Sequence, residues 1–159
     1  MAEATLHFVC ASGLSALAIA RWGVAEPEFS HVDIVLPDGS YLGARDDAIG
    51  GKPPGVQIRP PGYEKWIKQA TVKLPCDWGA LQTANDWALG EVGKKYDEDA
   101  ILGIILGQRW HKKGAWICSA FAGTYGHKLA FLKDLFLPAQ QTAPNMLFAM
   151  CGAAGAVIV

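Results

Sequence analysis

Residues 31–45, HVDIVLPDGSYLGAR, carry the strongest local structure signal in this chain. Two runs rich in strand-favouring residues flank Asp38-Gly39, and an Asp-Gly pair between such runs is typical of a tight β-hairpin. The first run opens at His31, and the pleat of a strand puts Asp33 on the same face as that histidine. The sequence therefore predicts an antiparallel hairpin with two ionisable side chains on one face.

Further strands are expected on both sides of this hairpin. Each is indicated by alternation of apolar and polar residues, or by a β-rich run that ends at proline. These segments are TLHFVCA (5–11), VQIRP (56–60) and TVKLPCDW (71–78).

Apolar residues recur at helical spacing in the remaining segments. One face of the helix expected in residues 77–95 is apolar, and Gly93 is placed to end it. That face consists of Trp78, Leu81, Ala84 and Ala88. Helices are also expected at residues 12–23, 97–110, 118–126 and 130–136, with Pro138 and Pro144 marking the exit from the last.

The composition is that of one globular domain. The chain has 159 residues, of which 51% are apolar, and this is enough for a sizeable core. No internal repeat or polar linker divides it, so we expect a single domain over residues 1–159. The mixture of strands and helices predicts an α+β fold, in which a small antiparallel sheet packs against helices.

The charge balance argues against a nucleic-acid partner. Fourteen Lys and Arg residues stand against fifteen Asp and Glu residues, which gives a formal net charge of −1. There is no basic tract and no nucleic-acid-binding motif.

The four cysteines are scattered singly, without the spacing of a disulfide framework or a zinc site. We therefore expect free thiols, no metal and no cofactor. The start of the chain, MAEATLHFVCASG, lacks the basic and uninterrupted apolar regions of a secretory signal. This favours a cytoplasmic or phage-encoded protein.

Residues 148–159 form an apolar C-terminal tail. The apolar run is shorter than the roughly 20 residues of a membrane-spanning helix, so we expect no transmembrane span. Its glycines also lower its helix propensity. A packed or loose tail is the first interpretation, and docking onto a protein partner is the second, because an exposed apolar end promotes aggregation.

WICSAF, residues 116–121, places a thiol at the expected start of a helix. Free backbone N–H groups and the helix dipole stabilise an anion there, and the N–H of Cys118 is suited to an oxyanion hole. His31 is the best candidate base, because a strand mounts it rigidly and imidazole titrates near neutral pH. The alternative for Cys118 is a small buried packing residue.

The other histidines have plainer interpretations. His7 is expected on an edge strand, His111 in a solvated basic loop, and His127 as a charge at a helix C-terminus. A zinc site built from Cys118 and scattered histidines lacks the usual ligand spacing.

Five short segments occur in a set order along the chain: FSHVDIVLPDG (29–39), YLGA (41–44), GVQIRP (55–60), GKKYD (93–97) and WICSAF (116–121). Together they resemble the permuted papain-like amidases, the YiiX/YaeF-like branch of the NlpC superfamily, whose wider relatives include lecithin retinol acyltransferase. The resemblance extends from about Thr5 to Leu147.

This resemblance implies a circularly permuted papain-like fold, in which the sheet with the histidine precedes the cysteine helix. It also implies Cys118 as the nucleophile, His31 as the base and Tyr96 near the thiol. The alternative for Tyr96 is a half-buried aromatic residue beneath the cysteine helix.

Position 43 departs from the family pattern. Relatives carry a polar residue on the second hairpin strand to orient the imidazole, and this chain has Gly43 there. Candidates for the orienting group are Asp33, Asp46, Gln57 and a main-chain carbonyl. Loss of a triad's third member lowers turnover without abolishing it.

These residues predict a cysteine hydrolase that cleaves an amide or ester through an acyl-thioester on Cys118. Candidate substrates are peptidoglycan stem peptides, lipid amides or esters, and isopeptide-linked protein tails. A thioester-dependent acyltransferase would use the same intermediate. The non-catalytic alternative is an inactive binding or assembly module, such as a phage particle component. Gly43 and the apolar tail favour this alternative, whereas the presence of Cys118, His31 and Tyr96 argues against it.

Overall fold

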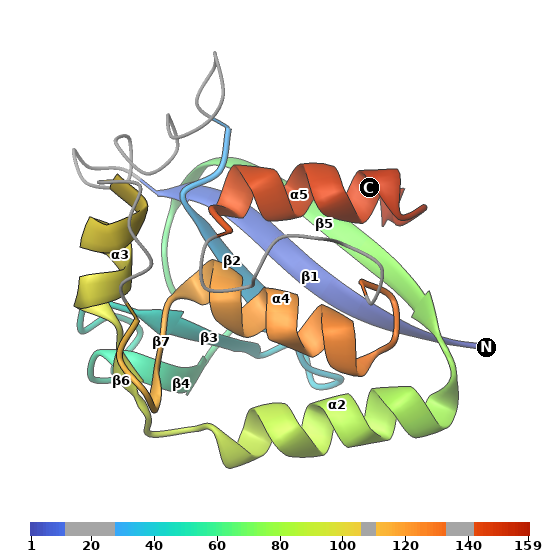
Figure 1. Cartoon of the computed structure of the whole chain (residues 1–159), viewed down its shortest axis with the longest axis horizontal. Helices are drawn as coiled ribbons and strands as arrows, with labels where there is room; N and C mark the ends of the chain where they lie inside the picture. Colours follow the sequence, from blue (N-terminus) through green and yellow to red (C-terminus); the bar gives the residue numbers. More distant parts are fainter. Residues whose placement is uncertain (12–27, 106–110, 133–141) are drawn as a thin grey trace.

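A six-stranded antiparallel sheet forms the centre of the protein, in the strand order β4-β3-β2-β1-β5-β8. The computed structural model describes residues 1–11, 28–105, 111–132 and 142–159 (Figure 1). The strands of this sheet are β1 (Ala2–Ala11), β2 (His31–Val35), β3 (Tyr41–Arg45), β4 (Gly55–Arg59), β5 (Trp66–Cys76) and β8 (Val157–Ile158). With the helices described next, the sheet confirms the predicted α+β class.

Four helices lie in the described ranges: α2 (Trp78–Gly90), α3 (Glu98–Ile105), α4 (Cys118–Lys128) and α5 (Pro144–Ala153). Figure 1 shows α4 lying across one face of the sheet, with α5 on one side of it and α2 on the other. A short parallel pair, β6 (Lys95–Tyr96) and β7 (Ala115–Trp116), forms a second sheet that lies against β4 of the main sheet. β6 leads into α3 and β7 leads into α4, so this pair sets where the first residue of α4 lies.

Apolar side chains from the central strands and the helices form the main core, and Ala100, Ile117 and Ala120 form a smaller cluster. Leu6 and Phe8 of β1, Val32 and Ile34 of β2, and Phe121 of α4 are buried together. Burial of each such side chain stabilises the fold by about 1.5–3 kcal/mol relative to exposure. The main core therefore joins the central strands to α4.

The hairpin predicted at residues 31–45 is confirmed. β2 pairs antiparallel with β3, and Val35 lies opposite Tyr41. Gly39 has a φ of 81°, a conformation that glycine adopts readily. Asp38 Oδ1 accepts hydrogen bonds from the backbone N–H and the hydroxyl of Ser40, at 2.9 and 2.6 Å. The chemistry of the Asp-Gly turn thus fixes the register of the two strands.

The helix expected within residues 77–95 forms as α2. Asp77 caps it by accepting a hydrogen bond from Ala80 N at 2.8 Å, and the helix ends at Gly90, ahead of Gly93. Its buried face is narrower than predicted, because the side chain of Trp78 is 71% exposed. The indole borders a surface depression that Leu81 also lines, instead of entering the core.

Some expected elements fall partly or wholly outside the described residues. The helix at residues 12–23 lies outside them. The helix at residues 97–110 is seen as α3 up to Ile105, and the segment at residues 130–136 is described only as far as Leu132, where it forms a turn.

The C-terminal tail is an ordered part of the domain. Pro144 begins α5 where an exit from the helices was expected, because a proline fits the first turn of a helix, where its missing N–H is not needed. Leu147 and Cys151 of α5 are buried, and β8 then pairs with the edge of β5, with Val72 opposite Ile158. None of the helices in the described ranges has the length and apolar character needed to cross a bilayer.

Candidate active site

Cys118 is the first residue of α4, as the sequence predicts. Ile117 before it is extended, with φ −94° and ψ 158°, and the first backbone bond of the helix runs from Phe121 N to Ile117 O at 3.0 Å. The N–H groups of Cys118 and the two residues after it therefore have no acceptor within the helix. Cys118 as a whole is 4% exposed, so its thiol is buried beside these donors.

His31, the first residue of β2, lies between Cys118 and an acid. Its Nε2 is 2.9 Å from Asp33 Oδ1, and the ring also makes a hydrogen bond with the side chain of Cys118. Because a carboxylate only accepts, Nε2 carries the proton toward Asp33, and Nδ1 is left for the sulfur. The three side chains thus form a chain of contacts from acid to imidazole to thiol.

This environment keeps the imidazole protonated at neutral pH. Burial by itself lowers the pKa of His31, but the charges of Asp33 and Cys118 and the hydrogen bonds to both raise it further, to about 9. The side chain is 8% exposed, so water screens these interactions little.

Asp33 is held in place by a second partner. The hydroxyl of Tyr63 donates a hydrogen bond to Asp33 Oδ2 at 2.7 Å, so each carboxylate oxygen has its own donor. Burial alone would raise the pKa of Asp33, but His31, the Tyr63 hydroxyl and the nearby Arg45 together lower it. The carboxylate is therefore ionised and faces the imidazolium of His31.

Arg45, the last residue of β3, braces this arrangement. Its guanidinium donates to both carboxylate oxygens of Asp47, at 2.6 and 2.8 Å, and to Glu64 Oε2 at 2.7 Å. It also donates to the Tyr63 hydroxyl at 3.3 Å. The segment that carries Tyr63 is thereby tied to the end of the hairpin.

Gly43 is the position on β3 that faces Asp33. A Cβ built there would lie 1.9 Å from Asp33 Oδ1, a distance that no two unbonded atoms can share. The carboxylate of Asp33 thus fills the space that a side chain at position 43 would enter. The acid that contacts His31 comes from β2, the same strand as the histidine.

The other residues predicted for the site lie around the contact between His31 and Asp33. Tyr96 on β6 is half-buried, and its pKa is raised well above the ordinary value by burial, then by the charges of Cys118 and Asp46. Asp46 follows β3 and is exposed, and its negative charge is one of the causes that raise the pKa of Tyr96. Gln57 lies opposite Gly43 in the β3–β4 pairing. Of the orienting groups considered, Asp33 is the one in contact with the ring of His31.

His7 is not on an edge strand, so that expectation was wrong. β1 lies between β2 and β5, because β5 returns along its other side. The His7 ring stacks on Tyr41 with centroids 4.9 Å apart and bonds Gln69 at 3.2 Å, and burial lowers its pKa. Within the described residues, no group of three His, Cys, Asp or Glu side chains is placed to hold a metal ion.

Sequence reasoning missed Tyr63 and Arg45. Tyr63 follows a pair of prolines and precedes a strand by a few residues, and no motif marks it. Arg45 lies two residues after Gly43 and so projects from the same face of β3, which was a usable signal.

Comparison of the chain with models of known protein families finds no match, and comparison with curated proteins finds none either.

Proposed function

We propose that this protein is a cysteine hydrolase that cleaves an amide or ester bond, with Cys118 as nucleophile and His31 as base. The observation that carries the proposal is the position of His31, whose ring interacts with Asp33 on one side and with Cys118 on the other. Nucleophilic acyl transfer requires a thiol, an imidazole in contact with it, and an acid that orients the imidazole.

In the proposed reaction, the proton given up by Cys118 is already held by His31 when the substrate binds, and the sulfur attacks the carbonyl carbon of the substrate. The tetrahedral intermediate collapses as the protonated His31 gives that proton to the leaving amine or alcohol, which leaves a thioester on Cys118. Water, deprotonated by His31, then attacks the thioester and releases the acid. Asp33 holds the ring orientation and stabilises the imidazolium throughout.

The start of α4 supports the charged steps. The N–H of Cys118 lies at the helix N-terminus, where the partial positive charge of the backbone stabilises both a thiolate and an oxyanion. Protonated His31 adds a full positive charge beside the sulfur.

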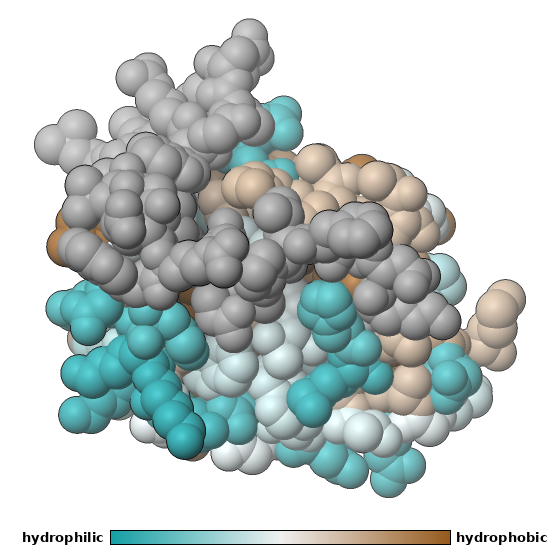
Figure 2. Space-filling view, in the orientation of Figure 1, coloured by the Kyte–Doolittle hydropathy of each residue, from teal (hydrophilic) through white to brown (hydrophobic). Residues whose placement is uncertain are grey.

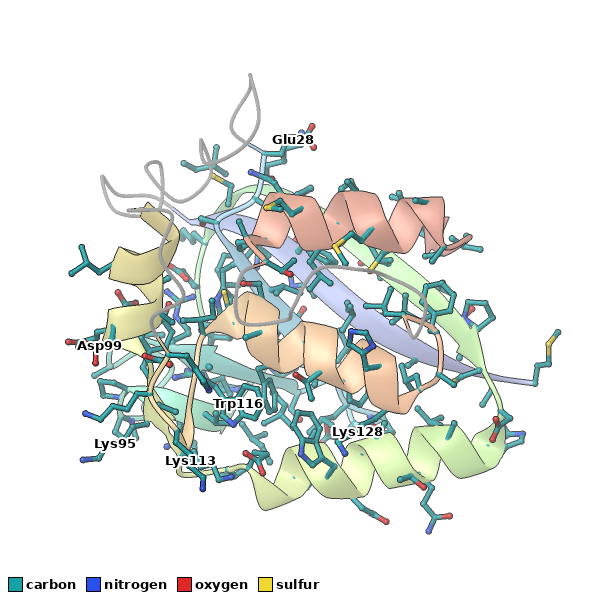
Figure 3. The ribbon with its side chains drawn as sticks, in the orientation of Figure 1. Glu28, Lys95, Asp99, Lys113, Trp116 and Lys128 are labelled. Atoms are coloured by element: carbon teal, nitrogen blue, oxygen red, sulfur yellow. The ribbon has the colours of Figure 1, made fainter. Side chains whose placement is uncertain are left out.

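The order of the parts supports a permuted papain-like arrangement. A strand with the histidine precedes the helix with the cysteine, and that helix lies across an antiparallel sheet (Figure 1). Figure 3 shows Trp116, at the end of β7, beside the start of this helix.

One of the two features that favoured an inactive binding or assembly module no longer supports it. Gly43 favoured that alternative because a glycine cannot orient an imidazole, but Asp33 now contacts the ring instead. An acyltransferase shares every step up to the thioester, so product analysis must separate water from an amine or alcohol as the final acceptor.

The decisive experiment is the alkylation rate of each cysteine by iodoacetamide as a function of pH, resolved by mass spectrometry. We expect Cys118 to react fastest of the four below neutral pH, because an imidazolium beside it favours thiolate. The buried Cys151, whose pKa burial raises to about 12, provides an internal control for an unactivated thiol.

The matched variant is His31→Asn, which keeps a polar side chain next to Asp33. It should slow labelling of Cys118 at acidic and neutral pH and leave the circular dichroism spectrum unchanged. Equal rates of Cys118 labelling in the parent and the variant would rule out His31 as the group that activates Cys118.

A further inference from the structure

A surface depression of about 220 Å³ lies at the end of β6, the strand that pairs with β7 ahead of α4. Its walls are Lys95 and Tyr96 from β6, Glu98 and Asp99 from α3, and Lys112. Tyr96 connects it to the candidate active site, because it lies opposite Trp116 in the β6–β7 pair, two residues before Cys118, and its phenol interacts electrostatically with the thiol. Pockets for whole drug-sized ligands have roughly 300–1,000 Å³, so this depression suits one group of a larger substrate.

The walls of the depression are tied together by one buried carboxylate. Asp97 Oδ1 accepts from Ala100 N at 3.0 Å, and Oδ2 accepts from His111 Nδ1 at 2.7 Å and from Lys112 N at 2.8 Å. Its own N–H donates to Trp116 O at 3.1 Å. Asp97 thus fixes β6, the first turn of α3 and the loop at Lys112 relative to β7, so the depression is preformed.

The charges around the depression are of both signs and are not paired. Within the part of the chain that the structure describes, none of its two lysines and two acids takes part in an ion pair. Close by, Lys94 pairs with Glu91 at 2.6 Å. The unpaired groups remain available to a ligand that carries both charges.

The surroundings are unsuited to an apolar group. Figure 2 shows a hydrophilic surface over the end of the molecule where Figure 3 places Lys95, Asp99 and Lys113. The ring of Tyr96 is the one aromatic surface among the five lining residues. A lipid chain would displace water from charged groups there without replacing their hydrogen bonds, which is unfavourable.

We infer that this depression binds an amino-acid-type group of the substrate, an ammonium and a carboxylate a few bonds apart, while the neighbouring amide reacts at Cys118. The inference rests on the proposed function and narrows it, because it selects peptide-like substrates over lipid amides and esters. Lys95 and Lys112 would receive the carboxylate, and Glu98 and Asp99 the ammonium.

Chloroacetyl amides that alkylate a thiol test the inference. The side-chain amines of lysine, ornithine and diaminobutyrate are chloroacetylated, and their α-amino and α-carboxyl groups are left free. The same probes are also made with those two groups capped as acetamide and amide. Simple chloroacetamide measures the reactivity of Cys118 without any contribution from the depression.

At low salt we expect at least one uncapped probe to label Cys118 about three- to tenfold faster than its capped form, since exposed ion pairs are individually weak. This advantage should shrink as salt is added. Lys95→Ala with Lys112→Ala, or Glu98→Gln with Asp99→Asn, should remove this difference between the rates of the uncapped and capped probes. Lys113→Ala, a neighbouring lysine that does not line the depression, should keep it.

Two results would overturn the inference, and they differ in what else they affect. If chloroacetamide labels Cys118 rapidly but capped and uncapped probes react at equal rates, the depression does not bind a charged group, and the thiol nucleophile stands. If neither chloroacetamide nor any amide probe labels Cys118, the proposed function fails together with the inference.

Discussion

The carboxylate of Asp33 occupies the space that a side chain at position 43 would need, so the two positions exclude each other. A Cβ at Gly43 would lie 1.9 Å from Asp33 Oδ1, the same oxygen that lies 2.9 Å from His31 Nε2. The acid beside the histidine can therefore come from β2 only when β3 carries a glycine at this position.

Replacement of that glycine should displace the acid. Gly43→Ala puts a methyl group onto Asp33 Oδ1, and we expect a loss of about 1–3 kcal/mol in the free energy of unfolding, with slower labelling of Cys118. Denaturant titration and iodoacetamide kinetics measure the two effects. Gly90→Ala is the matched control, because a Cβ at Gly90 meets nothing within 4 Å. A stable, fully reactive Gly43→Ala variant would contradict this account.

The same relationship predicts that a carboxylate at position 43 on β3 can replace the carboxylate of Asp33 on β2. Asp33→Ala should lower turnover, or Cys118 labelling below neutral pH, by roughly two to four orders of magnitude. Adding Gly43→Asp to Asp33→Ala places a carboxylate in the vacated space and should recover part of that loss. Gly43→Asp alone should be the most destabilised of the three variants. If the double variant is no more reactive than Asp33→Ala, a carboxylate on β3 in the space left by Asp33 is not enough to orient His31.

Tyr63 should act on the reaction through Asp33. Tyr63→Phe removes the donor to Oδ2 and leaves a buried carboxylate oxygen unpaired, which should lower stability by about 1–3 kcal/mol. The pH at which labelling of Cys118 declines should also shift, since Asp33 would hold His31 less firmly. Tyr41→Phe is the control, because Tyr41 packs against Tyr63 at 5.9 Å but does not supply that hydrogen bond. Identical pH profiles in the two variants would assign Tyr63 a purely structural role.

Stability should depend on pH above neutrality. The pKa of His31 is about 9 in the folded protein and 6.5 in an unfolded chain, so the fold favours the protonated ring. Its contribution is complete below pH 6.5 and is lost as the pH rises through 9, a decrease of about 3 kcal/mol at most. Urea titrations from pH 6 to pH 10 should show the decrease in the parent and a smaller one in His31→Asn. Parallel curves would mean that His31 is not held as an imidazolium.

The C-terminal strand should protect the sheet edge. Deletion of residues 157–159 removes both backbone bonds between Thr71 and Val159, at 3.1 and 2.9 Å, and uncovers part of β5. We expect faster aggregation, because an open edge pairs with other chains, and unchanged labelling of Cys118. Val159→Ser keeps the backbone bonds and should behave like the parent. Aggregation of Val159→Ser to the same extent would instead implicate the exposed side chain.

Local chemistry explains what sequence reasoning predicted well. The Asp-Gly turn fixes the β2–β3 hairpin, and the Asp77 cap with helical apolar spacing fixes α2, because these signals depend on residues a few positions apart. The start of α4 at Cys118 was likewise readable from WICSAF. By contrast, the sequence left open whether the tail packs or stays loose, because pairing of β8 with β5 joins residues far apart in the chain.

By itself, the sequence determined the α+β class, the hairpin that carries His31 and Asp33, and the thiol at a helix start. Only the tertiary structure decided that Asp33 faces the imidazole in place of a residue at 43, and that Tyr63 supports it from 30 residues away. The reason is physical: which side chains meet across a sheet depends on strand order and excluded volume. Neither is written in the spacing of neighbouring residues.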